Sequence, residues 1–286
     1  LWSNVLKDFP GPFRVGDYVA VVGQLRPFRG ELQLTVQKIW TVEQIRQIKQ
    51  ELKDFDVSLL HPSTPYDRAM MWRDLLDLVD QELSGPLQEL VLSLLQQHES
   101  TWQLAPAARR IHHAYEGGLL EHTWFVARLA CQTARLYPNL NRQLVVAGAI
   151  LHDIGKLKEL AQPYAPEYTV TGQLLGHIVL GWEMIRQAAV ECHFPDQGLL
   201  LQLEHIIITH HGFQEFGSPV LPKTREAMLV YFVDDLDAKM KMMEQHLQAD
   251  TSGREFTPYH RLLQRELYQL TEKPETVPPE EAPEAD

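Results

Sequence analysis

The feature that most constrains this chain is the run from Leu151 to Lys156, which contains the adjacent residues His152 and Asp153. A His-Asp pair at the end of an apolar run, followed by a Gly and a Lys, can place two metal ligands and a cation in one pocket. Neutral imidazole and carboxylate together suit Mn, Fe, Co or Zn better than Ca or Mg. The pair alone is weak evidence for a metal site, because these residues fall together by chance in many proteins. Its weight comes from five further ligand-type residues on neighbouring predicted helices.

The length and composition limit the class of protein. With 286 residues, the chain is long enough for one large domain or two modest ones. No apolar run approaches the roughly 18 residues that a membrane span needs, so we expect no membrane partner. The two cysteines, Cys131 and Cys192, form neither a disulfide framework nor a CxxC metal motif. We therefore expect a cytoplasmic location.

The formal net charge of −12 argues against a protein that grips nucleic acid by bulk electrostatics. The charge is uneven, however. The Pro/Glu-rich end of the chain, residues 271–286, carries six acids and one Lys, and we predict that it is a disordered acidic tail. Residues 1–45 are close to neutral. A nucleic-acid substrate therefore remains open, provided that its binding is local.

Residues 15–40 predict two strands, because apolar residues alternate on both sides of a turn at residues 26–30. One interpretation is a plain hairpin on a small β-domain. The other is the back half of an OB-type barrel, whose open face binds single strands. Arg26, Phe28 and Arg29 at the tip would then contact the nucleic acid. The span is too short for five strands, so this barrel would be incomplete at its N-terminus.

The rest of the chain predicts a mainly α-helical fold. Residues 42–62 indicate a short helix and a linker, and from Tyr66 to about residue 270 the apolar periodicity is helical. We therefore divide the chain into a partial OB-type segment (1–45), a linker (46–65), a helical domain (66–270) and the acidic tail (271–286).

Several candidate ligands point toward the interior of this helical domain. His122, His177 and His210 each lie on the apolar stripe of a predicted helix, His211 follows directly, and Asp234 lies on an inner face. An inward His taken singly is usually a hydrogen-bonded core residue. A buried Asp needs a partner or a metal to offset its desolvation. Taken together, these residues favour a shared metal site.

The order and local motifs of these residues resemble the HD superfamily of metal-dependent phosphohydrolases and, more closely, the YhaM-type 3′–5′ exoribonucleases. The motifs that carry the resemblance are residues 117–123, 150–156, 176–178, 210–212, 217–219 and 234–240. This family places an OB-fold before an HD-domain helical bundle, the same order as predicted here. The chain departs from the pattern at its N-terminus, where early barrel strands are missing.

The resemblance implies a set of metal ligands. The first ion would be held by His122, His152, Asp153 and Asp234. A second ion would be held by His177, His210 and His211, with Asp153 as the bridge. Two cations suit phosphodiester hydrolysis, although a single metal remains an alternative if the three additional histidines only orient substrate. Mn is the ion that we expect, with Fe, Co or Zn as alternatives.

Further residues are candidates for contact with substrate. Lys156 lies one helical turn beyond His152 and, with Asp153, would take a catalytic part by neutralising a phosphate oxygen. His113 and Ser218 would bind substrate. The loop 212–224 would form a wall of the substrate channel, with Phe213 or Phe216 available to stack a base. For Lys156 the alternative is a solvated lysine, for His113 it is a structural histidine, and for the loop 212–224 it is a plain connection between helices.

The leading functional hypothesis is a metal-dependent 3′–5′ exonuclease acting on single-stranded RNA, with DNA as an additional candidate substrate. Hydrolysis follows from the ligand set, whereas polarity and the preference for RNA are implied only by the resemblance. The alternatives are a phosphohydrolase of small nucleotides or cyclic dinucleotides and a non-catalytic nucleic-acid-binding module. The Gly-Tyr-Pro triplet of one cyclic-dinucleotide class is replaced here by residues 217–219, Gly-Ser-Pro. Assembly into a homo-oligomer is left open.

Overall fold

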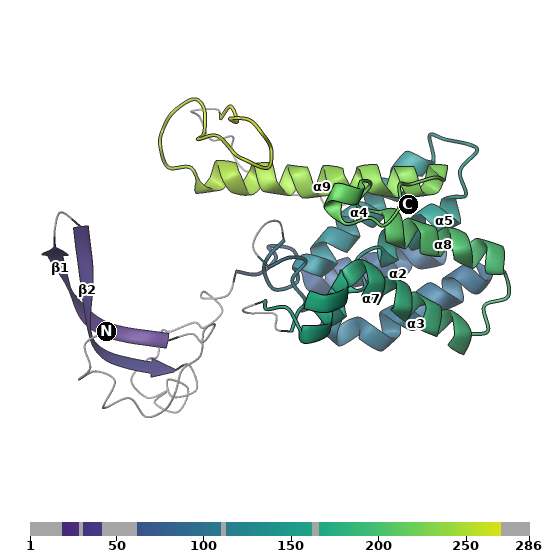
Figure 1. Ribbon diagram of the computed structural model, residues 1–286, viewed down its shortest axis with the longest axis horizontal. Helices are drawn as coiled ribbons and strands as arrows, with labels where there is room; N and C mark the ends of the chain where they lie inside the picture. Colours follow the sequence, from purple (N-terminus) through teal and green to yellow (C-terminus); the bar gives the residue numbers. More distant parts are fainter. Residues whose placement is uncertain (1–18, 29–30, 42–61, 110–112, 162–165, 270–286) are drawn as a thin grey trace, which may run out of the picture.

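The computed structural model describes residues 19–28, 31–41, 62–109, 113–161 and 166–269. It confirms a mostly helical chain with a small two-stranded sheet near its N-terminus (Figure 1). The predictions for residues 42–61, for Arg29 and for the tail 271–286 lie outside the described residues. The domain boundaries stay predictions.

The sheet is an antiparallel hairpin. Strand β1 (Val19–Phe28) pairs with β2 (Glu31–Thr41), and the register is irregular between Val22 and Gly23. A Cβ atom at Gly23 would overlap the carbonyl of Thr35, so this close approach requires a glycine. The predicted turn was too long, because β1 continues to Phe28. The described residues of this region contain only these two strands, so the OB-type barrel stays a prediction.

The helical part is a bundle around a single apolar core. Its α-helices are α2 (Arg68–Glu82), α3 (Gly85–Trp102), α4 (Gly118–Ala134), α5 (Arg142–Leu151), α6 (Lys156–Glu159), α7 (Val170–Glu191), α8 (Gln197–Thr209) and α9 (Arg225–Ala249). The side chains of Asp67, Asn141, Thr169, Asp196 and Thr224 accept hydrogen bonds from first-turn N–H groups of α2, α5, α7, α8 and α9. These caps satisfy donors that the helices cannot satisfy internally.

Helix α5 lies at the centre of the bundle. It packs against α2, α3, α4, α8 and α9, and every residue from Leu144 to Leu151 is buried. A helix that is apolar on all sides is stable only inside a core. Because His152 and Asp153 follow its last turn directly, the central helix delivers them into the interior.

The prediction that the helical pattern continues to about residue 270 was wrong for residues 250–269. Helix α9 ends at Ala249, and the described residues 250–269 form turns and two isolated antiparallel bridges, Phe256 with Tyr268 and His260 with Arg265. Gly253 in a left-handed conformation (φ 66°) and Pro258 interrupt the helical pattern there. Across the described residues, the structure has no helix with the length and apolar character of a membrane span.

Two glycines set the position of α7 beside the His-Asp motif. Gly176 has φ 72° and ψ 160°, and this kink directly precedes His177. At Gly155, an added Cβ would overlap the carbonyl oxygen of His177 and lie 2.5 Å from the backbone nitrogen of Gly181. Backbone therefore packs directly on backbone here, and His177 is brought close to Asp153.

We expect Gly155→Ala to destabilise the fold by about 2–3 kcal/mol, because the obstructing atoms belong to the backbone and cannot rotate away. Denaturant unfolding monitored by circular dichroism measures this change. Gly198→Ala is the matched control, because a Cβ there meets only the flexible side chain of Asp196. Equal free energies of unfolding for Gly155→Ala and the wild type would contradict the proposed close contact.

Candidate metal centre

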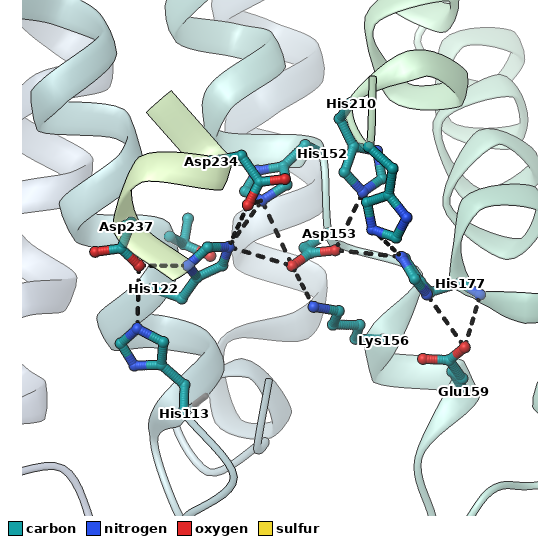
Figure 2. A network of polar contacts seen from close by, with 12 residues as sticks. His113, His122, His152, Asp153, Lys156, Glu159, His177, His210, Asp234 and Asp237 are labelled. Atoms are coloured by element: carbon teal, nitrogen blue, oxygen red, sulfur yellow. Dashed lines mark hydrogen bonds and ion pairs between the residues drawn. The ribbon is translucent and has the colours of Figure 1, made fainter. Parts of the chain in front are cut away.

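The seven predicted ligands come from five separate parts of the helical bundle, and the structure brings them together (Figure 2). His122 lies on α4, His152 and Asp153 follow α5, His177 lies on α7, His210 and His211 follow α8, and Asp234 lies on α9. They form two adjacent groups with Asp153 between them.

The first group surrounds one oxygen of Asp153. The Nε2 atoms of His122 and His152 are 3.1 Å apart, and each lies 3.4 Å from Asp153 Oδ2. Asp234 Oδ1 is 3.1 Å from His122 Nε2 and 3.7 Å from His152 Nε2. Two imidazole nitrogens and two carboxylate oxygens therefore face one small volume.

The second group faces the other oxygen of Asp153. His177 Nε2 lies 3.3 Å from His211 Nε2. His177 Nε2 and His210 Nε2 lie 3.6 Å and 3.5 Å from Asp153 Oδ1. One carboxylate thus offers a different oxygen to each group, which is the geometry that a bridging ligand needs.

Each of the five imidazoles is oriented through its Nδ1 atom. The partners are Asp237 Oδ2 for His122 (2.7 Å), Ala149 O for His152 (2.8 Å), Glu159 Oε1 for His177 (3.1 Å), Ile207 O for His210 (2.6 Å) and Phe216 O for His211 (2.6 Å). Carbonyl and carboxylate oxygens accept hydrogen bonds, so Nδ1 carries the proton in each ring. Each Nε2 atom is left to face the centre and, once unprotonated, offers its lone pair there, as in histidines that bind metal.

Two buried acceptors indicate that a cation fits this centre. Asp153 Oδ1 and His210 Nε2 are both buried and have no hydrogen-bond partner among the described residues. A carboxylate and an unprotonated ring nitrogen cannot bond to one another, since both are acceptors. Leaving such groups buried without a partner is costly, and a divalent cation would satisfy both at once.

The charges of the centre are strongly coupled. Burial raises the pKa of Asp153, but Lys156 and His152 lower it more, so that it lies well below its usual value. Burial lowers the pKa of Lys156, whereas Asp153, whose Oδ2 is 2.6 Å from its Nζ, raises it above the usual value. Both side chains are therefore charged at neutral pH. Burial, followed by the neighbouring His210 imidazole, lowers the pKa of His211 to about 4, so this candidate ligand is neutral at neutral pH.

His122 has a different environment. Burial lowers its pKa, but hydrogen bonds with Asp153, Asp234 and Asp237 raise it well above the usual value. A cation that binds its Nε2 atom therefore displaces a proton. Asp237 is the key partner in this part of the site, since the same Oδ2 atom also lies 3.0 Å from His113 Nε2.

Of the residues predicted to contact substrate, some are buried in the helical bundle and others are exposed on the sheet. His113 is fully buried behind His122, with Nδ1 3.1 Å from the Tyr115 hydroxyl and Nε2 3.0 Å from Asp237 Oδ2, so its ring supports Asp237 here and its contact with substrate stays a prediction. Ser218 is also buried, and its hydroxyl has no partner among the described residues. Arg26 and Phe28 are exposed on β1, which Figure 1 shows apart from the bundle.

Glu159 is a functional residue that the sequence reasoning missed. Its Oε1 atom accepts hydrogen bonds from both the backbone nitrogen of His177 (3.0 Å) and the Nδ1 atom of the same residue (3.1 Å). The only sequence signal is its place one turn after Lys156 on a short helical segment. The contact depends on the kink at Gly176, which no local pattern reveals.

We expect Asp237→Ala to weaken Mn²⁺ binding by the first group about 10- to 100-fold, because His122 loses the acceptor that fixes its orientation. Calorimetric titration with MnCl₂ measures the affinity. Asp235→Ala on the same helix is the control, since this carboxylate pairs with the exposed Lys239 (2.6 Å). If both variants bind Mn²⁺ equally well, Asp237 does not orient a ligand.

Comparison with known proteins agrees with this geometry. The family model described as HD domain matches residues 119–239, which include every ligand named above. A second model, described as a putative helicase, matches residues 63–140 and ends before His152. No solved structure gave a significant match.

Two curated relatives carry the same name. The chain is 36% identical over 257 residues to the 3′-5′ exoribonuclease YhaM of Bacillus subtilis (strain 168), and the match covers 88% of this chain and 78% of the relative. It is 34% identical over 271 residues to the 3′-5′ exoribonuclease YhaM of Bacillus pumilus (strain SAFR-032), with 95% and 83% covered. Identity of this extent over most of both chains shows that the protein belongs to the YhaM 3′–5′ exoribonuclease family, with an HD domain that carries its candidate metal centre.

Proposed function

We propose that this protein is a metal-dependent 3′–5′ exoribonuclease that hydrolyses phosphodiester bonds of single-stranded RNA. The observation that carries the proposal is the pair of ligand groups on the two oxygens of Asp153. Polarity and the RNA substrate are supported by the names of the two relatives. DNA is a further candidate substrate.

The proposed ligand set is that of a two-ion centre. The first group, with Asp153 Oδ2, would hold one cation, and the second group, with Asp153 Oδ1, would hold the other. Mixed imidazole and carboxylate ligation suits Mn, Fe, Co or Zn better than Ca or Mg, and of these we propose Mn²⁺, with Fe, Co and Zn as alternatives. Bound in this way, the ions would supply a nucleophile at neutral pH and stabilise the charge that develops on the phosphate.

In this proposal Lys156 acts through its positive charge. Lys156 is only 8% exposed and its ammonium is fixed against Asp153, so its charge acts where little water screens it. We propose that it lies near a non-bridging phosphate oxygen while it holds the orientation of the shared carboxylate. Glu159 and Asp237 fix His177 and His122, so the site is organised before substrate arrives.

The N-terminal segment would add contacts for the RNA strand. We propose that residues 1–45 act as a partial OB-type segment, joined through residues 46–65 to the HD domain (66–270), which the acidic tail (271–286) follows. Arg26 and Phe28 on β1, with Arg29, are the proposed contacts, and the exposed ring of Phe28 is suited to stacking. A homo-oligomer remains part of the proposal.

The direct test is a 5′-labelled single-stranded RNA incubated with the protein and Mn²⁺. We expect products that shorten progressively from the 3′ end. Asp153→Asn should lower the rate about 100-fold or more, because both ligand groups lose their shared charge while the side chain keeps its shape. Circular dichroism checks that the helical content is retained.

The same assay separates the alternatives. Immediate release of the labelled 5′-terminal nucleotide, or internal cleavage, would contradict the proposed polarity. Turnover of a mononucleotide or cyclic dinucleotide without any RNA ladder would favour the small-nucleotide phosphohydrolase. RNA binding without turnover in Mn²⁺, Fe²⁺, Co²⁺ or Zn²⁺ would favour a binding module.

The two-ion proposal predicts the effect of removing one ligand of the second group. The wild type should bind two Mn²⁺ per chain, and His210→Ala should bind one, since the first group does not use this imidazole. Elemental analysis after dialysis measures the ratio. A wild-type protein that saturates with one ion would overturn the two-ion assignment and leave the hydrolytic proposal to a single centre.

A further inference from the structure

Aromatic rings lie side by side next to the second ligand group. The ring centroids of Phe216 and Phe213 are 6.1 Å apart, those of Phe213 and Tyr231 are 5.8 Å apart, and those of Tyr231 and Phe232 are 4.9 Å apart. We call these residues the aromatic row: Phe216, Phe213, Tyr231 and Phe232. Three of these residues are strongly exposed, at 60% for Phe216, 47% for Phe213 and 58% for Phe232. A continuous exposed patch of this kind marks a contact surface.

The aromatic row begins at the metal centre. His211 donates its Nδ1 hydrogen to the carbonyl oxygen of Phe216, so one end of the row is tied to a ligand. Tyr231 lies one turn before Asp234 on α9, and its ring packs on Gly212, where a Cβ would overlap it. Gly212 adopts φ 77°, which suits a glycine, and leaves the space that the ring fills.

The other end of the row meets two cations. Phe232, Lys223 and Arg225 line a groove of about 790 Å³ at the start of α9. Both cations are exposed, and neither has a carboxylate within ion-pair distance in the part of the chain that the structure describes. Lys223 is held in place through its backbone nitrogen, which donates to His205 Nε2 (2.8 Å). On a chain with a net charge of −12, two unpaired cations beside exposed rings indicate a local site for an anionic, ring-bearing ligand.

We infer that the aromatic row stacks bases of the single-stranded RNA as the strand enters the metal centre, and that Lys223 and Arg225 contact its phosphates. This inference rests on the proposed function, because it names the path of the substrate of the same site. Single strands are bound by aromatic side chains that stack on bases, combined with cations that follow the backbone. Stacking is tolerant of sequence, as an exonuclease that removes successive nucleotides of different kinds needs.

The test compares removal of one ring from the protein with removal of one base from the RNA. Single abasic nucleotides are placed at successive positions near the 3′ end of a short RNA, and the first cleavage is timed with wild type and with Phe216→Ala. We expect an abasic residue at one position to slow the wild type about 10-fold or more, the loss typical of one stacked base. Phe216→Ala should lose a similar factor on intact RNA and nothing further at that abasic position.

This design separates stacking from a damaged fold. A misfolded variant would cleave every substrate more slowly by the same factor. A variant that lacks one stacking contact would instead no longer respond to an abasic nucleotide at the one position where the wild type does. Phe213→Leu keeps the apolar packing of the row without its aromatic face and should lose the same positional penalty. Phe256→Ala is the control, since this exposed ring contacts Tyr268 in the segment after α9.

The role of the cations is tested by measuring how the affinity for RNA depends on salt concentration. Lys223→Gln should weaken RNA binding uniformly across sequences and reduce the slope of log affinity against log salt by about 1, as expected for one lost phosphate contact. An unchanged slope would remove Lys223 from the path.

Three results would overturn the inference. If the losses from Phe216→Ala and from the abasic residue multiply at every position while the wild type still produces a 3′–5′ ladder, the strand does not stack on the row and the proposed function stands. If Phe216→Ala changes the association state of the protein in solution and leaves RNA kinetics intact, the row is an interface between copies. Absence of any RNA ladder with the wild type would remove both proposals.

Discussion

The burial of Asp153 is the constraint on which the rest of the site depends. This residue is only 1% exposed, and the pKa of its carboxyl group lies well below the usual value, so it is charged inside the protein. A buried charge is stable only if its surroundings compensate for the lost hydration. Lys156 compensates part of it from one side. In the proposed two-ion centre the imidazoles would compensate further, because their Nε2 atoms and the carboxylate would share bound cations.

The fold provides this arrangement with simple means. Helix α5, which is apolar and buried from Leu144 to Leu151, places Asp153 at the end of a buried element, and backbone contact at Gly155 brings α7 close enough for His177 to reach it. Backbone carbonyls orient His152, His210 and His211, whereas acidic side chains orient His122 and His177. The carbonyls that hold His152, His210 and His211 lie within five residues of these rings in the sequence. The rings held by Asp237 and Glu159 depend on tertiary packing and are the more sensitive points of the site.

Much of the bundle and its ligands could be predicted from the sequence, because an inward histidine on an amphipathic helix keeps its direction whatever the packing of the bundle. The ligand groups around Asp153 follow from such stripes and from the resemblance to the family. The burial of His113 and the contact of Glu159 with His177 could not be predicted, since they arise where separate segments meet. The end of the helical region was misjudged because the apolar residues after Ala249 continue in turns and bridges.

Crystals of the protein soaked with Mn²⁺ and measured at a wavelength that gives anomalous signal would test the central claim most directly. Two anomalous peaks are expected, one on each side of the Asp153 carboxylate, the first among the Nε2 atoms of His122 and His152 and the second among those of His177, His210 and His211. Peaks located elsewhere, or a carboxylate of Asp153 that contacts only Lys156 in saturating Mn²⁺, would contradict it.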